Sequence, residues 1–490
     1  MDKAIVILYI VSMIGFGFVG KSKATTESDF LVAGRRLGPA LYGGTMAAIV
    51  LGGASTIGGV GLGYEYGLSG MWLVVSIGMG ILLLSLLFAH RIQRLGIYTV
   101  SQMLTLRYGP GSHVLSGVVM CAYTLMLATT STIAYATIFS VLFDLDKVPA
   151  IMIGGGTVIL YSALGGMWSI TLTDFVQFFI KTIGIFFILV PVALAKGDGW
   201  GGITDGFQRV TGHSGTDLTA IGGQTIVTYF VIYTFGLLIG QDIWQRVFTA
   251  RTPAVARWAG TAAGVYCLAY AFAGSVIGMS ARVLLPAGDA KVKDDAFAAF
   301  VEFALNPVLA GLVLAAALAA VMSTSSGALI ASATVARQDI VNLIRGATGH
   351  QDTGDEHDHV TGNRLYLIAF GIVMIALACV LQDVVAALTV AYDILVGGLL
   401  VAILGGLVWR RGNNRGALVS IGVGVAVTLA TMLVVGDIYA NEPIYYGLAS
   451  SALAYIITSL LTPPTDPAIM AEWDARNAGT TTQVPEADPV

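Results

Sequence analysis

Residues 307–327 read PVLAGLVLAAALAAVMSTSSG, an aliphatic run that ends in four consecutive hydroxyl side chains and a glycine. The hydroxyls belong to Ser323, Thr324, Ser325 and Ser326. A lipid bilayer offers them no water, so each must bond to a helix carbonyl, a neighbouring helix or a ligand. A single membrane serine usually bonds to a carbonyl of its own helix. Four in succession favour a contact between helices or a binding site.

The whole chain has the composition of a multi-pass membrane protein. Its 490 residues are 56% hydrophobic and 11% charged, whereas soluble domains carry about 25% charged residues. The predicted fold is therefore all-α, with about thirteen apolar spans long enough to be transmembrane helices. We expect them near residues 4–20, 38–66, 70–89, 113–143, 149–167, 173–195, 222–248, 257–283, 307–336, 363–382, 384–409, 415–436 and 443–462.

Basic residues indicate how the chain is oriented in the cell membrane. Most of them, including the pairs Arg35–Arg36 and Arg410–Arg411, fall in loops on one side of the expected spans. The positive-inside rule then places the N-terminus outside and the C-terminus in the cytoplasm. The last residues, 463–490, are polar and contain several prolines, so we expect a disordered cytoplasmic tail.

Two of the spans are interrupted by glycine. Span 38–66 carries Gly52, Gly53, Gly58 and Gly59 among others, and span 222–248 carries Gly236 and Gly240. Glycine at this density weakens a helix, although some glycines serve close helix packing. The two spans open two successive groups of five, so the second group starts from the opposite face of the membrane. Paired broken helices in inverted halves are typical of transporters with a midplane site.

This pattern predicts an organisation in six parts. They are a first helix and cytoplasmic linker (1–37), core repeat one (38–195), an extracellular loop (196–221), core repeat two (222–409), two peripheral helices (410–462) and the tail (463–490).

Five motifs resemble those of the sodium:solute symporter family. They are DFLVAGRRLGP (29–39), TLRYG (105–109), YSALGGMWSITLTDFVQ (161–177), GQDIWQR (240–246) and AAVMSTSSGALIASATVARQDI (319–340). The resemblance implies a LeuT-like inverted repeat, with one helix before the ten-helix core and two after it. It also implies a transporter rather than an enzyme, which imports a solute together with Na⁺.

The resemblance further implies where sodium binds. The ligands carried over are the main-chain oxygens of Ala48, Leu51 and Ala320 and the hydroxyls of Ser323 and Thr324. Hard cations take oxygen ligands, and five neutral oxygens suit a monovalent ion that must be released again. The four-hydroxyl run is thus interpreted as half of an ion site.

The sequence leaves open whether a second ion site exists. Asp174 and Ser326 match the second site of some family members, but Gly327 stands where a further hydroxyl is preferred, and Ser325 is the candidate replacement. One sodium ion is therefore the expected stoichiometry. Asp174 has two other interpretations: it attracts the departing ion, or it belongs to a helix N-cap that starts at Thr173 or Asp174.

Two ionisable residues lie deep in apolar spans, where such residues usually have a function. Lys181 follows Asp174 by seven residues, and Asp393 lies within the eleventh span. Three hypotheses compete for Lys181: it pairs with Asp393, it contacts an anionic group of the solute, or it carries a proton that supplements or replaces sodium.

The solute is expected between the broken helices, beside the ion. The candidate residues are Ser55, Thr56, Thr129, Thr130, Ser131, Tyr233, Thr234, Phe235 and Thr389. Sugar-transporting family members use a Gln and a Glu where this chain has Ser55 and Val74, so a hexose would leave hydrogen bonds unmade. A small amino acid, a monocarboxylate or a similar compact metabolite fits better.

The expected function is sodium-coupled import of that solute by alternating access. The alternative is a proton-coupled or uncoupled carrier that uses Lys181 and Asp393. A channel would need a continuous polar path, and an enzyme a nucleophile with a base in reach; the sequence indicates neither. The expected partners are the solute, the sodium ion and membrane lipid, with no nucleic acid and no obligate protein partner.

Overall fold

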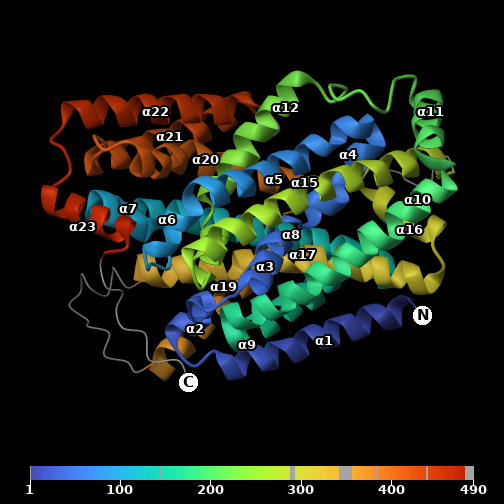
Figure 1. The fold of residues 1–490 in the computed structure, drawn as a ribbon, viewed down its shortest axis with the longest axis horizontal. Coiled ribbons are helices and arrows are strands. Elements are labelled where there is room, and N and C mark those ends of the chain that lie inside the picture. The colour runs from blue at the N-terminus through green and yellow to red at the C-terminus, as the bar shows by residue number, and fades with distance from the viewer. Residues whose placement is uncertain are drawn as a thin grey trace.

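A computed structural model describes residues 2–143, 145–286, 293–341, 356–381, 384–436 and 440–480. Its regular elements in these ranges are helices, which run mainly along the longest axis of the molecule (Figure 1). The short helices α7 (Val100–Tyr108) and α23 (Pro467–Ala478) lie at one end, whereas α11 (Gly199–Thr211) and the N-terminus lie at the other. The predicted all-α membrane fold is confirmed.

Ten helical stretches of the described chain are long and apolar enough to cross a membrane, or eleven if one bent pair counts as a span. The long helices are α1 (Asp2–Lys23), α8 (His113–Phe143), α9 (Lys147–Thr182), α15 (Pro253–Leu284), α17 (Pro307–Val335), α19 (Glu356–Val380), α20 (Val384–Val408), α21 (Asn414–Val435) and α22 (Glu442–Leu461).

Two of the ten stretches are too long for one crossing. Lys147–Lys196 has 50 residues, and an unbroken helix of that length would measure about 75 Å against a hydrocarbon core of about 30 Å. Its backbone leaves the helical region at Gly165 and Gly166. The 41-residue stretch Ala54–Arg94 contains a 3₁₀ turn, Gly67–Met71. The count therefore depends on how these breaks are treated, and thirteen spans stays a prediction.

Both glycine-rich spans are broken, as predicted. The first contains α3 (Pro39–Val50), a non-helical segment at 51–52, a π-helical turn (Ala54–Gly58) and α4 (Gly59–Tyr66). The second contains α12 (Gly223–Tyr229), a π-helical turn (Phe230–Thr234), α13 (Phe235–Ile239) and α14 (Gln241–Thr249). The chain bends by 44° between α13 and α14, at Gly240, which has extended backbone angles.

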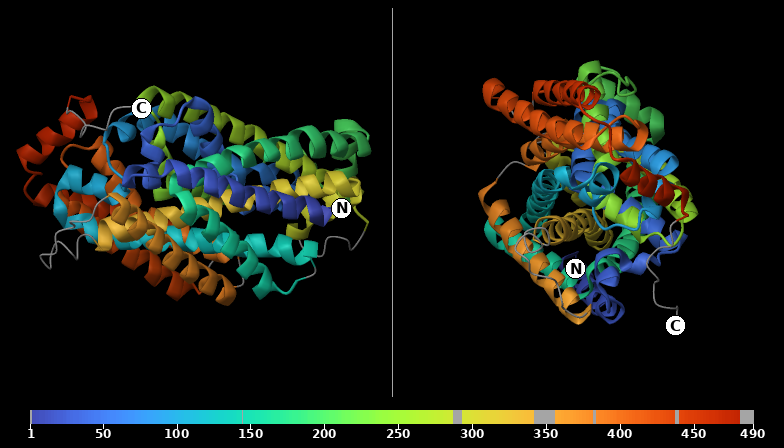
Figure 2. Two further views of the ribbon diagram at one scale, coloured as in Figure 1. Left: turned by 90° about the horizontal axis from the view of Figure 1, so that it is seen from below. Right: turned by 90° about the vertical axis from the view of Figure 1, so that its left-hand side faces the viewer.

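The hydroxyl-bearing helix α17 lies inside the bundle. It packs against α1, α3, α8, α9 and α19, and Figure 2 shows it, in gold, among the other helices rather than at the rim. All four hydroxyl residues are buried. The hydroxyl run therefore faces other helices, not hydrocarbon.

The prediction of a wholly disordered tail is wrong for residues 467–478. These residues form α23, which begins after Asp466, whose side chain accepts a hydrogen bond from the amide of Ala468. Trp473 is buried against the rest of the protein, and Arg476 donates to the carbonyl of Leu95. Composition missed the helix because a single buried tryptophan and a few polar contacts are enough to dock it.

Candidate ion and solute site

The break after α3 leaves main-chain carbonyls facing the hydroxyls of α17. Ser323 Oγ donates to Ala48 O at 2.8 Å and also lies 2.8 Å from Ala320 O. Thr324 Oγ1 lies 2.6 Å from Ile49 O and 3.5 Å from Ala320 O. We call the oxygens of Ala48, Leu51, Ala320, Ser323 and Thr324 the cage. The structure brings the cage residues together, and it adds the carbonyl of Ile49, which the sequence did not single out.

Glycine allows this close approach of α3 and α17. A Cβ atom at Gly52 would lie 2.3 Å from Thr324 Oγ1, far closer than two unbonded atoms tolerate. Leu51 ends α3 with φ −95° and ψ 61°, so carbonyls at this point are released from helical hydrogen bonds. Backbone breakage and small side chains together bring the carbonyls to the hydroxyls.

Lys181 already occupies part of the cage. Its Nζ donates to Ala48 O at 3.0 Å and to Leu51 O at 3.2 Å, and the side chain is fully buried. The lysine reaches this point from α9, which packs against α3.

The first of the three hypotheses for Lys181, a pair with Asp393, is wrong. The ammonium bonds to α3, while neither carboxyl oxygen of Asp393 has a hydrogen-bond partner among the residues that the structure describes. Asp393 lies on α20, which packs against α8 and α13. Spacing along the sequence could not show that the two side chains point to different helices.

Asp174 forms a buried ion pair instead of a helix cap. Its Oδ2 lies 3.2 Å from an Arg246 guanidinium nitrogen and accepts from Thr45, and both charged side chains are fully buried. Thr173 and Asp174 lie within α9, well after its break at Gly165 and Gly166, so the N-cap hypothesis is wrong.

The guanidinium of Arg246 also fills the space beside Gly327. A Cβ atom there would lie 2.6 Å from an Arg246 nitrogen. Ser326 donates to the carbonyl of Ser323, and Ser325 contacts the hydroxyl of Thr132. A fixed positive charge beside Asp174 disfavours a second cation at this position. The second ion site therefore stays a prediction that the geometry does not favour.

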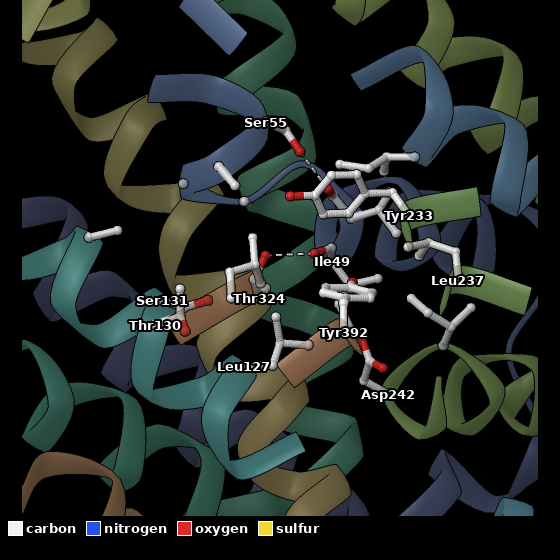
Figure 3. A pocket seen from close by; sticks show the side chains of 18 residues that line it. Ile49, Ser55, Leu127, Thr130, Ser131, Tyr233, Leu237, Asp242, Thr324 and Tyr392 are labelled. Atoms are coloured by element: carbon white, nitrogen blue, oxygen red, sulfur yellow. Dashed lines mark hydrogen bonds between the residues drawn. The ribbon is translucent and has the colours of Figure 1, made fainter. Parts of the chain in front are cut away.

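A cavity lies next to the cage, between the broken helices. Its empty space, counted with the part that is open to solvent, is about 540 Å³. Of the predicted solute residues, Ser55, Thr130, Ser131 and Tyr233 line it, and Thr324 of the cage forms part of its wall. Figure 3 shows Thr130 and Ser131 of α8 across the cavity from Tyr233.

The other predicted solute residues lie outside the lining. Thr56 shares a hydrogen bond with Tyr270, Thr234 donates to the carbonyl of Ser76, and Thr129 donates to the carbonyl of Leu125. Phe235 and Thr389 also do not line the cavity. The packing of the neighbouring helices decides whether such a hydroxyl faces the cavity, and the sequence alone does not show that packing.

The prediction missed two side chains of the lining that carry polar groups. Tyr392 of α20 lies edge-on to both Tyr123 and Tyr233, with ring centroids 5.3 and 5.4 Å apart, and it faces the cavity (Figure 3). Asp242 of α14 also lines the cavity, close to Tyr392 (Figure 3), and accepts a hydrogen bond from Tyr123 at 3.2 Å. Its position in GQDIWQR, directly after the break at Gly240, was the available signal.

Known transporters share this sequence pattern. A model of the sodium:solute symporter family matches residues 30–424. The sodium/proline symporter of Staphylococcus aureus strain JH9 is 27% identical over 392 residues, which cover 76% of this chain and 74% of that protein.

Solved structures share the fold. A Na⁺-coupled sialic acid symporter in a substrate-bound outward-open state matches with a TM-score of 0.80 at 19% identity, covering 95% of this chain and 98% of that one. Mhp1, a nucleobase-cation-symport-1 family transporter, matches with a TM-score of 0.55 at 16% identity, covering 91% and 98%. At these identities the likeness concerns the fold, which is the LeuT-like one. Because the family model matches most of this chain, the chain belongs to the sodium:solute symporter family.

Proposed function

We propose that this membrane protein imports a compact amino acid or monocarboxylate together with sodium, by alternating access. The observation that carries the proposal is the cage: carbonyls released by the break after α3 lie within hydrogen-bond distance of the Ser323 and Thr324 hydroxyls. Neutral oxygens that converge inside a membrane protein suit a desolvated alkali cation. Membership of the family makes the chain a transporter, and sodium is here a cargo ion.

The cavity supports a small solute with an apolar body and few polar groups. Most of its lining is aliphatic or aromatic, and its hydroxyls come from Ser55, Thr130, Ser131, Tyr233, Tyr392 and Thr324. Asp242 is the one acidic side chain that lines it among the described residues. A carboxylate in this position favours a solute with an ammonium or imino group, so an amino acid is the preferred class. The sodium/proline symporter relative makes proline the first compound to test.

Lys181 supports a second candidate function. A buried ammonium at the ion cage is also what a proton-coupled carrier on the same fold would need, since its charge depends on one proton. Such a carrier would import the solute without external sodium.

The proposal includes an orientation and a division of the core. The N-terminus lies outside the cell membrane and the C-terminus inside, because basic residues are concentrated on the α7 and α23 side. Residues 38–195 and 222–409 form the two inverted halves, each of which begins with a broken helix.

Uptake by purified protein in liposomes tests the proposal. Radiolabelled proline, other small amino acids and monocarboxylates are offered with an inward sodium gradient, or with choline in place of sodium, each with and without an imposed proton gradient. The proposal expects one of these solutes to accumulate only with sodium. Accumulation in choline that follows the proton gradient would select the second candidate, and no accumulation of any of them would contradict the proposed solute class.

A further inference from the structure

The position of Lys181 is the least expected feature of the ion site. Lys181 lies outside the five motifs that carry the family resemblance, yet its ammonium donates to two of the five oxygens assigned to sodium. The side chain is fully buried, and it comes from α9 rather than from either helix that forms the cage.

Sodium and this ammonium cannot share the cage. An ion coordinated by the carbonyls of Ala48 and Leu51 must lie within a few ångströms of both oxygens, and Nζ already lies 3.0 and 3.2 Å from them. The lone pairs of these two carbonyl oxygens, which would face a sodium ion, accept hydrogen bonds from the ammonium instead. Two positive charges this close, away from water, also repel each other strongly.

We propose that Lys181 is a tethered competitor of sodium: its ammonium and a sodium ion occupy the cage alternately. This inference rests on the proposed function, because it concerns the same ion site. The ammonium satisfies the released carbonyls when sodium is absent, so the break after α3 does not leave buried oxygens unpaired. Sodium entry then requires the lysine side chain to leave, which weakens sodium binding and favours release of the ion.

The surroundings of Lys181 offer an alternative acceptor. Asp174 lies seven residues earlier on α9, and long helical side chains point back toward the helix start. Its Oδ2 is engaged by Arg246 and Thr45, while its Oδ1 has no hydrogen-bond partner among the described residues. The other ionisable group near the ammonium is the buried thiol of Cys267 on α15. A displaced ammonium therefore has one carboxylate oxygen to move toward.

Sodium-dependent thermal stabilisation of the purified full-length protein tests the proposal, because it reports binding rather than transport. Sodium chloride replaces choline chloride at constant ionic strength, for the wild type, Lys181→Met and Lys181→Gln. Removing the competing charge is expected to lower the half-saturating sodium concentration by about tenfold or more. Lys181→Arg keeps the charge and is expected to show no such gain. Lys196→Met, a lysine at the exposed end of α10 (Val190–Lys196), is the matched control.

A double variant tests whether the tighter sodium binding takes place at the cage. Adding Ser323→Ala to Lys181→Met is expected to abolish the tighter sodium binding. An unchanged half-saturating concentration in the folded Met and Gln variants would overturn the proposal, as would a lack of any sodium response in all variants. Proline and the other solutes are titrated in the same assay at saturating sodium chloride, so a failure of the solute site is recognised separately from a failure of the competition.

Discussion

At the scale of single residues, the proposed ion site depends on hydroxyl side chains, which in a membrane helix usually bond only to a carbonyl of their own helix. Ser332, nine residues after Ser323 on α17, bonds to the carbonyl of Ala328 and to Thr124, which is simple helix packing. Ser323 differs because its hydroxyl reaches a carbonyl of another, broken helix. A membrane serine is therefore assigned to an ion site by its partner, not by its type.

Ser323→Ala is expected to weaken sodium binding. Loss of one of five ligands should raise the half-saturating sodium concentration by about tenfold, or ~1.4 kcal/mol, in thermal-shift titrations. Ser332→Ala serves as the control and should leave the titration unchanged. Equal effects of the two substitutions would contradict the assignment of Ser323 to the cage.

Asp174→Asn is expected to destabilise the protein, since it leaves the Arg246 guanidinium buried without its carboxylate. Breaking a buried pair costs about 3–5 kcal/mol, so Tm should fall clearly in differential scanning fluorimetry. Asp474→Asn breaks the exposed Arg410–Asp474 pair and should change Tm little. If Asp174 mainly holds a second sodium ion, Asp174→Asn would instead change the sodium titration while Tm in choline stays constant.

At the scale of elements, the breaks in α3–α4 and α12–α14 are what position the site. Glycine density predicted both breaks, because each glycine destabilises the helix at its own position and the weak positions can be located in the sequence. The contacts made at the breaks were less predictable. Lys181 shows the limit: its depth in an apolar span was evident, but its carbonyl partners depend on how α9 packs against α3. The same holds for Tyr392, which enters the cavity from α20.

Gly52→Ala tests the close approach of α3 and α17. The new methyl group would lie 2.3 Å from Thr324 Oγ1, so the helices must separate and sodium-dependent stabilisation should be lost. Gly58→Ala adds the same group on the same span, where its nearest neighbour is 3.9 Å away. Retained sodium binding in Gly52→Ala would show that the ion does not need this contact.

At the scale of the whole molecule, the sequence predicted the class of fold better than its details. Apolar runs and the order of five motifs indicated a LeuT-like transporter, and the family match and structural neighbours confirm it. The number of membrane spans and the structure of the C-terminal tail were harder to predict. Kinks such as Gly165–Gly166 join or divide helices, and α23 is held by Trp473 and a few polar contacts that composition does not reveal.

The proposed orientation predicts which single cysteines are accessible from outside in intact cells. Asp217→Cys lies in the exposed loop between α11 and α12, and Ala471→Cys lies on the exposed face of α23. A membrane-impermeant maleimide is expected to label Asp217→Cys in intact cells and Ala471→Cys only after permeabilisation. The native Cys121 and Cys267 are buried and the native Cys379 is partly buried, so a cysteine-free background gives the baseline. The reverse labelling pattern would invert the orientation.

The most direct measurement is solute-triggered entry of ²²Na⁺ into liposomes that contain the protein. External proline, or another small solute of the tested panel, is expected to start sodium entry in a fixed ratio to its own uptake, and Ser323→Ala should reduce both fluxes together. Solute uptake that proceeds without any sodium entry would contradict the view that released carbonyls and hydroxyls between α3 and α17 bind the ion that drives import.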